Sequence, residues 1–419
     1  MSRASGAGRR IDGDWGLLAG ASLVLAFSAV GFLVQTFGVF ATAIESEFGW
    51  SRTETYSVLV AATLLAPVLI PATGWAADRW NLRTLVLSAL AIEVLCLIAL
   101  GILPAGRIGF SAAFLVTYAA SFGASAVPLA KAVGTAFTER RGAALGILFA
   151  GACLGAVTNP LIAGALVAGI GWQGAFLALG AQTALLAGVP ALLLIRPART
   201  LPSAAPQRTE GAIPRAGWRS LFRTRALFVI LGWAFFAALG YGGLQGHLVP
   251  LLEERMHTPA DAVIGQSLLG VGLLIGNLAA GLLLDRIATR PLASLMLAVP
   301  VAALVALAAI PVGPADIVVT TAVGIATGTE TAMLAYVVSR YLPAAVGGRG
   351  LSVGMVAVAL GGGVSTFLGA VTHDATGDYR GFLLLCAVFL AIAAVWPWGL
   401  REREAPAPET KDATTPVEA

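Results

Sequence analysis

Twelve long apolar segments, separated by short breaks rich in Arg, Pro or Gly, make up most of the 419 residues. Each approaches the roughly 20 residues that a helix needs to cross the hydrocarbon core of a membrane. Only 11% of the residues are charged, against about 25% in soluble proteins. We therefore predict an all-α membrane protein with twelve transmembrane helices. The expected spans are residues 15–42, 56–77, 84–103, 109–135, 143–168, 173–195, 225–252, 262–284, 291–311, 315–339, 351–372 and 379–400.

The basic residues are unevenly divided between the two sides that such a topology creates. If the N-terminus is cytoplasmic, 21 Lys and Arg residues fall in cytoplasmic segments and four fall outside. Excess Lys and Arg in short loops mark the cytoplasmic side. We therefore predict a multi-pass protein of the inner membrane with two cytoplasmic tails, residues 1–14 and 401–419.

An internal duplication is visible in the loops. The pattern G-x-x-x-D-R-x-x-x-R begins at Gly74 and again at Gly281, an offset of 207. R-G-A-A-L-G from Arg141 and R-G-L-S-V-G from Arg349 repeat at an offset of 208. Parallel repeats of this kind are typical of transporters built from two similar halves. The expected units are an N-terminal six-helix half at 15–195, a cytoplasmic linker at 196–224 and a C-terminal six-helix half at 225–400.

Twelve helices in two halves with this loop motif resemble the major facilitator superfamily over about residues 12–400. Within it, the chain is similar to the monocarboxylate transporter group and its bacterial relatives. The strings that carry this second resemblance are DGDWG from Asp12, FGWSR from Phe48, TERRG from Thr138, GWQGAF from Gly171 and HLVPLL from His247.

The resemblance implies a secondary active transporter that works by alternating access. Its substrate site would lie at mid-membrane between the halves, lined by the first, fourth, seventh and tenth helices. A small organic anion of the monocarboxylate type, moved together with a proton, is the implied cargo. The expected partners are thus a small-molecule substrate, a proton and the lipid bilayer, with no nucleic acid and no cofactor. We expect no ATP-driven pump, because no Walker-type motif occurs, and no enzyme, because no supported Ser-His-Asp set occurs. We expect no metal site, because the three cysteines are far apart and lack metal-type spacing.

The repeated loop motif is the first candidate functional element. Its Gly would allow close helix approach, and its Asp could accept hydrogen bonds from a helix N-terminus or from Arg. Such ties would bias the balance between transport states, whereas the arginines also serve topology. We expect these cytoplasmic gate residues to be Gly74, Asp78, Arg79 and Arg83, with Gly281, Asp285, Arg286 and Arg290 in the second half.

Three ionisable residues, Glu93, Lys131 and Glu330, lie well inside expected spans, where a charge is costly and marks a functional candidate. Glu93 and Lys131 are at similar depth, which would allow an ion pair. Lys131 either has a structural role, in such a pair or by extending its side chain to the membrane surface, or has a role in the substrate path. Glu330 is in the tenth span, so we expect it to carry a proton with the substrate. The alternative is a permanently protonated acid bonded to a neighbouring helix.

Four further polar residues fall on the expected path: Gln35, Tyr118, His247 and Asn277. Monocarboxylate transporters resembling this chain carry cations where it has Gln35 and Asn277. An amide cannot supply the charge with which Arg clamps a carboxylate. Either Lys131 compensates or the substrate is neutral or zwitterionic. His247 is either a pH-sensitive path residue or a satisfied histidine at a helix end.

Two alternatives to a proton-coupled anion symporter follow from these departures. One is an exporter of amphipathic drugs or metabolites with the same fold. The other is a transport-inactive membrane sensor that keeps the fold but lacks the polar path.

Overall fold

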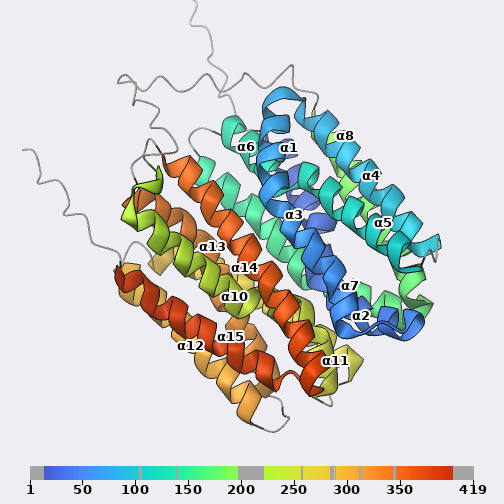
Figure 1. The fold of residues 1–419 in the computed structure, drawn as a ribbon. Coiled ribbons are helices and arrows are strands. Elements are labelled where there is room, and N and C mark those ends of the chain that lie inside the picture. The colour runs from blue at the N-terminus through green and yellow to red at the C-terminus, as the bar shows by residue number, and fades with distance from the viewer. Residues whose placement is uncertain are drawn as a thin grey trace, which may run out of the picture.

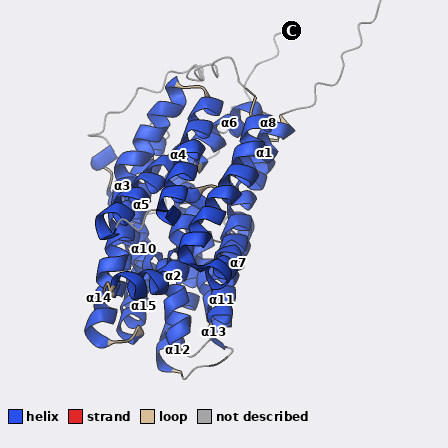
Figure 2. Cartoon of the chain, turned by 90° about the vertical axis from the view of Figure 1, so that its right-hand side faces the viewer, coloured by secondary structure: helices blue, strands red, loops and turns tan. Residues whose placement is uncertain are grey.

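The computed structural model describes residues 14–102, 106–137, 140–196, 221–255, 258–283, 287, 289–310, 313, 315–342 and 346–399. The helices form two groups that stand side by side (Figure 1), and from the side most run nearly parallel (Figure 2). We call these groups the N-terminal and C-terminal halves. The 1–14 and 401–419 tails and the 196–224 linker lie almost wholly outside the described residues.

Eleven helical stretches in the described part of the chain are long and apolar enough to cross a membrane. One of them, Arg141–Leu194, has 54 residues, about twice the length that one crossing needs. It turns back at Gly171, whose φ of 74° and ψ of 170° are accessible mainly to glycine. The stretch therefore counts as two spans, and the predicted twelve-helix architecture is confirmed.

The N-terminal half contains six spans, several of them divided into shorter elements. They are α1 (Trp15–Phe27), α2 (Ala29–Phe48), α3 (Arg52–Arg79), α4 (Leu82–Ile102), α5 (Gly106–Ser121), η1 (Phe122–Ala124), α6 (Ala126–Ala136), α7 (Arg141–Gln182), η2 (Thr183–Gly188) and α8 (Val189–Leu194). The C-terminal half has longer, undivided helices. They are α10 (Arg225–Glu254), α11 (Pro259–Leu283), α12 (Thr289–Ala309), α13 (Ala315–Tyr341), α14 (Gly347–Thr376) and α15 (Arg380–Val395), with η3 (Trp396–Gly399).

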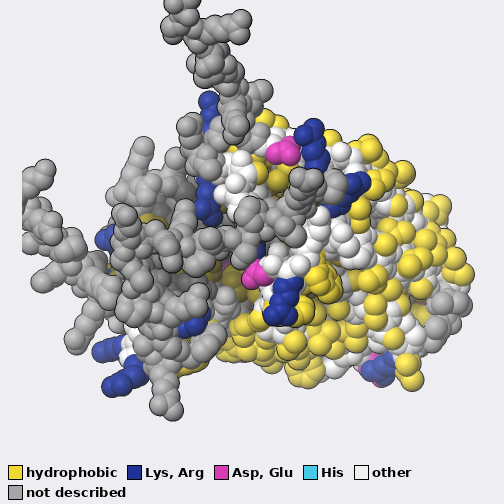
Figure 3. Space-filling view, turned by 90° about the horizontal axis from the view of Figure 1, so that it is seen from above, with side chains coloured by type: hydrophobic (Ala, Val, Ile, Leu, Met, Phe, Trp, Pro, Cys, Tyr) yellow, Lys and Arg dark blue, Asp and Glu magenta, His cyan; other side chains and the backbone are white. Residues whose placement is uncertain are grey.

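The bundle has two ends of different charge. At the linker end, where α1 and α10 begin, Lys and Arg side chains gather over the face seen in Figure 3. At the opposite end, where α2 meets α3 and α14 meets α15, acids are more frequent. The described basic residues of the linker end are Arg79, Arg83, Lys131, Arg140, Arg141, Arg196, Arg223, Arg225, Arg290, Arg340 and Arg349; those of the opposite end are Arg52, Arg107, Arg255 and Arg380.

The first span is broken at Ser28, where an extended residue (ψ 162°) separates α1 from α2. A break frees backbone groups that hydrocarbon cannot satisfy, so neighbouring side chains must pair with them. Three buried or part-buried side chains from the same half do so. Glu93 Oε2 accepts from Ala29 N (2.7 Å), Asn159 Nδ2 donates to Ala26 O (2.8 Å) and Thr183 Oγ1 donates to Phe27 O (3.1 Å).

The fourth span is also broken, by the short 3-10 turn η1 between α5 and α6. The repeat offset of 207 maps Gly123 in this turn onto Glu330, where α13 is a continuous helix. The two halves share a plan but differ in helix continuity at their centres.

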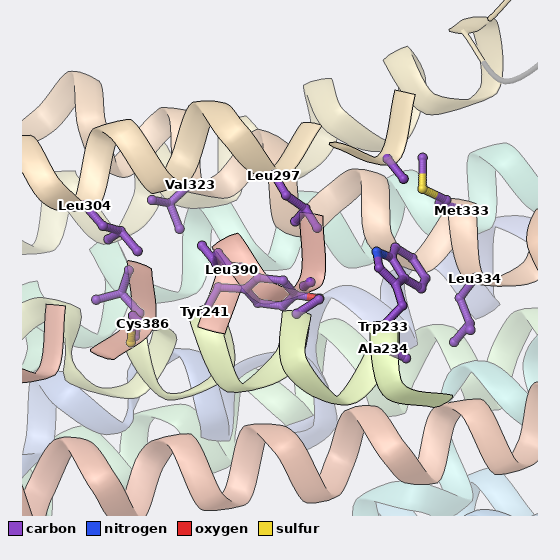
Figure 4. Close-up of a cluster of buried hydrophobic side chains, with 14 of the residues drawn as sticks. Trp233, Ala234, Tyr241, Leu297, Leu304, Val323, Met333, Leu334, Cys386 and Leu390 are labelled. Carbon is purple, nitrogen blue, oxygen red and sulfur yellow. The ribbon is translucent and has the colours of Figure 1, made fainter. Parts of the chain in front are cut away.

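Each half has its own apolar core. In the C-terminal half, Trp233 and Tyr241 of α10 point toward side chains of α12, α13 and α15 (Figure 4). Glycines permit backbone contact between α11 and α13: a Cβ on Gly276 would lie 2.0 Å from Ile325 O. Close approach at small residues is how helices pack without a hydrophobic driving force in lipid.

The two halves touch along three helix pairs: α3 with α14, α7 with α11, and α2 with α10. Their polar contacts are concentrated at the opposite end.

Candidate functional site

Arg52, the first residue of α3, is the centre of a charged cluster at the opposite end. Its guanidinium forms ion pairs with Glu45 (3.0 Å) and Glu254 (3.6 Å) and donates to the hydroxyl of Tyr379 (2.8 Å). Arg52 and Glu45 belong to the N-terminal half, whereas Glu254 and Tyr379 belong to the other. Together with Asp374, we call these residues the Arg52 cluster.

Asp374 joins the halves through the backbone of α3. Its two carboxylate oxygens accept from the amides of Arg52 (3.2 Å) and Thr53 (2.8 Å). These are among the first amides of α3, which have no partner within the helix, and the positive end of the helix dipole lies here. An acid near the end of α14 therefore caps a helix of the other half.

A second contact between the halves lies one turn deeper. Tyr56 stacks on His247 with ring centroids 3.8 Å apart, and its hydroxyl donates to Gly246 O at 2.7 Å. Tyr56 comes from α3 and His247 from α10, and both side chains are fully buried. The contact fixes the lateral position of one half against the other.

His247 has a partner at each ring nitrogen: Thr366 O lies 2.9 Å from Nε2 and the Tyr379 hydroxyl lies 3.0 Å from Nδ1. A carbonyl only accepts, so Nε2 donates to it, and Nδ1 of the neutral ring accepts from Tyr379. Burial raises the pKa of Tyr379, which keeps this hydroxyl protonated. A directed chain thus runs from Arg52 through Tyr379 and His247 to Thr366. Both ring nitrogens of His247 thus have hydrogen-bond partners, which favours the structural alternative for this residue over the pH-sensitive path residue.

At the linker end, the loop motif of the N-terminal half ties helices within that half. Asp78, near the end of α3, forms an ion pair with Lys131 of α6. Lys131 is thereby beside the gate motif and not paired with Glu93, whose carboxylate binds Ala29 N instead. The structure does not bring Glu93 and Lys131 together, because the long Lys131 side chain reaches toward the membrane surface.

The other motif residues have local partners. The guanidinium of Arg79 lies 4.3 Å from the ring centre of Trp75, and Arg83 donates to Leu192 O at 2.7 Å. Gly74 has no atom within 4 Å of the position of a Cβ, so the expected close helix approach is not present here.

In the second motif, Asp285 and Arg286 lie outside the described residues, and so do the surroundings of Gly281. Arg290 is part-buried near the start of α12.

The expected path residues do not form a single cluster. Glu330 is buried in the C-terminal half, one turn from Leu334 of the core, and its Oε1 has no hydrogen-bond partner among the described residues. Tyr118 is buried against Phe122 in the N-terminal half. Gln35 is part-buried, and its Oε1 likewise has no partner among the described residues.

Asn277, like His247, lies between the halves. Its amide nitrogen donates to Leu273 O at 3.1 Å and is 4.0 Å from the sulfur of Cys153 in α7. The α7–α11 contact is tight nearby, because a Cβ on Gly270 would lie 2.6 Å from Ala156 O.

Sequence reasoning missed the Arg52 cluster. Arg52 and its hydrogen-bond partner Tyr379 are 327 positions apart, and no spacing rule connects the members of the cluster. The available signal was the rarity of basic residues at this end, where Arg52 is one of four.

The sequence is similar to known membrane transporters. The sequence matches the Major Facilitator Superfamily over residues 23–323 and 248–418. A relative described as an MFS-type efflux pump of Mycolicibacterium smegmatis is 32% identical over 158 residues. That match covers 36% of this chain and 35% of the relative, so it spans about a third of the relative's length.

Solved structures share the whole fold. An inward-facing, unoccupied bacterial homolog of the human lysosomal transporter Spinster aligns with a TM-score of 0.73 and 20% identity, over 91% of this chain and 95% of that one. A mutant of the nucleoside transporter NupG aligns with a TM-score of 0.73 and 14% identity, over 92% and 100%. Neither likeness assigns the chain to the monocarboxylate group. The fold, the repeat and the sequence match together show that the chain is a transporter of the major facilitator superfamily.

Proposed function

We propose that the chain carries a small amphipathic organic solute, neutral or positively charged, by alternating access. The main support for this proposal is that the charged side chains buried in the described residues are acidic. Among the described residues, the buried acids are Glu93, Glu330 and Asp316, and no Lys or Arg side chain is buried. Asp316 is paired with Arg255 at the opposite end, whereas Glu93 and Glu330 lie within the helix bundle.

A carboxylate substrate needs a cation to offset its loss of water. Compensation by Lys131 was one of two alternatives drawn from the sequence, but Asp78 binds Lys131 at the linker end. Gln35 and Asn277 supply only neutral amides. The relative that matches about a third of the chain is described as an efflux pump, which supports export as the direction of transport.

Transport into proteoliposomes tests this proposal. The purified protein would be reconstituted, and a lipophilic cation such as tetraphenylphosphonium compared with radiolabelled lactate and pyruvate, with protein-free vesicles as the control. We expect protein-dependent flux of the cation. Flux of the carboxylates alone would overturn the proposal in favour of anion transport, and no flux of any solute would favour the sensor.

We further propose that Glu330 couples transport to protons. Its carboxyl is buried and its Oε1 has no hydrogen-bond partner among the described residues, so the charged form is costly and the carboxyl readily holds a proton. Glu330→Gln keeps the shape but cannot titrate. It should abolish proton-driven accumulation while substrate exchange survives, whereas Glu47→Gln, at an exposed acid of α2, should do neither. Unchanged accumulation by Glu330→Gln would exclude the residue from coupling.

We also propose, from the distribution of Lys and Arg, that this is an inner-membrane protein whose linker end faces the cytoplasm. The gathering of Arg at that end supports it (Figure 3). A single cysteine at Asp378 should react with an impermeant maleimide from the outer face. Reaction from the cytoplasmic face alone would reverse the topology.

A further inference from the structure

A cavity of about 640 Å³ lies between the halves, toward the opposite end of the bundle. Its walls come from α2 and α7 of one half and from α10 and α11 of the other. It extends about 15 Å inward along α7, since Leu161 on its wall is ten residues before Gly171. The lining residues are Val39, Thr42, Ala43, Ser46, Leu161, Gly164, Ala165, Val167, Ala168, Val249, Glu253, Pro259, Ala260, Val263 and Ile264.

The wall is apolar except near its outer rim. Leu161 of α7 and Ile264 of α11 are each 42% exposed, although both are apolar side chains in spans that cross the membrane. Both residues line the cavity, so this exposed surface belongs to its apolar wall. The two helices touch beside them, because a Cβ on Gly164 would lie 2.8 Å from Val263.

Glu253 is the one charged residue among the described residues of the lining. Thr42 Oγ1 donates to its Oε2 at 3.3 Å, which leaves Oε1 without a hydrogen-bond partner among the described residues. The cations nearby are already engaged: Arg52 in its cluster, and Arg255 in two hydrogen bonds to Asp316. The carboxylate of Glu253 is consequently the electrostatic feature that a ligand in this cavity meets.

We propose that this cavity is a binding site for an amphipathic organic cation. The inference rests on the proposed function and adds to it a location and a recognition group. The volume falls within the range of about 300–1,000 Å³ for small-molecule pockets. The apolar wall receives the body of the ligand, and Glu253 and Thr42 receive its positively charged head. Because both halves form the wall, a change in their relative position reshapes the site.

Binding measurements on the full-length protein in nanodiscs test this site. The probes are rhodamine 6G, a fluorescent lipophilic cation, and Nile red, a neutral dye of similar size, each followed by fluorescence anisotropy. Glu253→Gln should weaken rhodamine 6G binding about tenfold and leave Nile red unchanged. Ala165→Trp, which fills the cavity, should weaken both dyes.

Two matched variants serve as controls. Asp261→Asn removes an acid at the same end that binds Thr258 and is not part of the wall. Leu154→Trp adds the same bulk on an exposed face of α7 away from the cavity. Thermal unfolding and size-exclusion profiles of all four variants show that each is folded. Equal losses in Asp261→Asn and Glu253→Gln, or no loss in Ala165→Trp, would overturn the site.

The site and the proposed function can fail separately. If rhodamine 6G binding follows the expected pattern but wild-type vesicles transport no cation, the site stands and the transport proposal fails. If cations are transported with the same KM by wild type and Glu253→Gln, the site is wrong and transport stands.

Discussion

Replacing Asp374 with Asn should open the end of the molecule that the Arg52 cluster closes. The carboxylate caps α3 from the other half through two hydrogen bonds, at 3.2 and 2.8 Å. The amide keeps the shape and one acceptor oxygen but loses the charge and the second acceptor. The contact is made between the halves, so its loss penalises only the conformation in which this end is closed.

The size of the effect follows from the exposure of the pair. A hydrogen bond to a charged group contributes about 1.5–3 kcal/mol when buried, and a charge at a helix end about 0.3–1 kcal/mol. The Asp374 side chain is 30% exposed, so solvent reduces both contributions. We expect a net loss of about 1–2 kcal/mol, which changes the ratio of closed to open molecules by about 5–30-fold.

Distance measurements between spin labels report this ratio directly. Labels at Glu47 in α2 and Ile310 after α12, both exposed, would be placed in a background without Cys96, Cys153 and Cys386. Pulsed electron–electron double resonance in nanodiscs should show a larger population at long distance in Asp374→Asn than in the wild type.

The matched control is Asp261→Asn, because Asp261 binds Thr258 of its own half. It should leave the distance distribution unchanged. An identical distribution in wild type and Asp374→Asn, or an equal shift in the control, would show that this cap does not hold the halves together.

Three further outcomes are expected. Asp78→Asn should lower the transport rate in a flux assay by no more than about fivefold without loss of membrane insertion, since its exposed ion pair contributes up to about 1 kcal/mol. Lys131→Met should lower the rate by the same factor, and the double variant should lower it no further than either single variant. Gly276→Ala should destabilise by about 1–3 kcal/mol and lower the thermal unfolding midpoint, whereas Gly146→Ala, with open space at its Cβ, should not. Tyr379→Phe should cost about 1–3 kcal/mol in the same assay, because a buried histidine nitrogen loses its donor; an unchanged midpoint would argue against the chain of hydrogen bonds.

The spans were predictable because membrane thickness sets their length. The expected break between residues 168 and 173 contains the Gly171 turn, and the expected third span at 84–103 corresponds to α4. Apolar length carries no information on continuity, however. The breaks at Ser28 and at η1 leave the hydropathy of their spans unchanged, so they were not predicted.

The contacts were less predictable than the spans. Depth along a helix axis put Lys131 level with Glu93, but the four-carbon stem of lysine carries its charge away from its Cα. The link from Arg52 to Asp374 joins residues 322 positions apart. It depends on how the halves stand against each other, which no local pattern in the sequence encodes.

The clamped break at Ser28 has a mechanical consequence. Straightening this span would leave the Glu93 carboxylate and the amide nitrogen of Asn159 buried without their backbone partners, at a cost of about 1–3 kcal/mol for each group. All the clamping side chains belong to the N-terminal half, so movement of the C-terminal half does not relax them. We therefore expect the bend to persist as a fixed shape of the N-terminal half, and not to act as a hinge, when the two halves move.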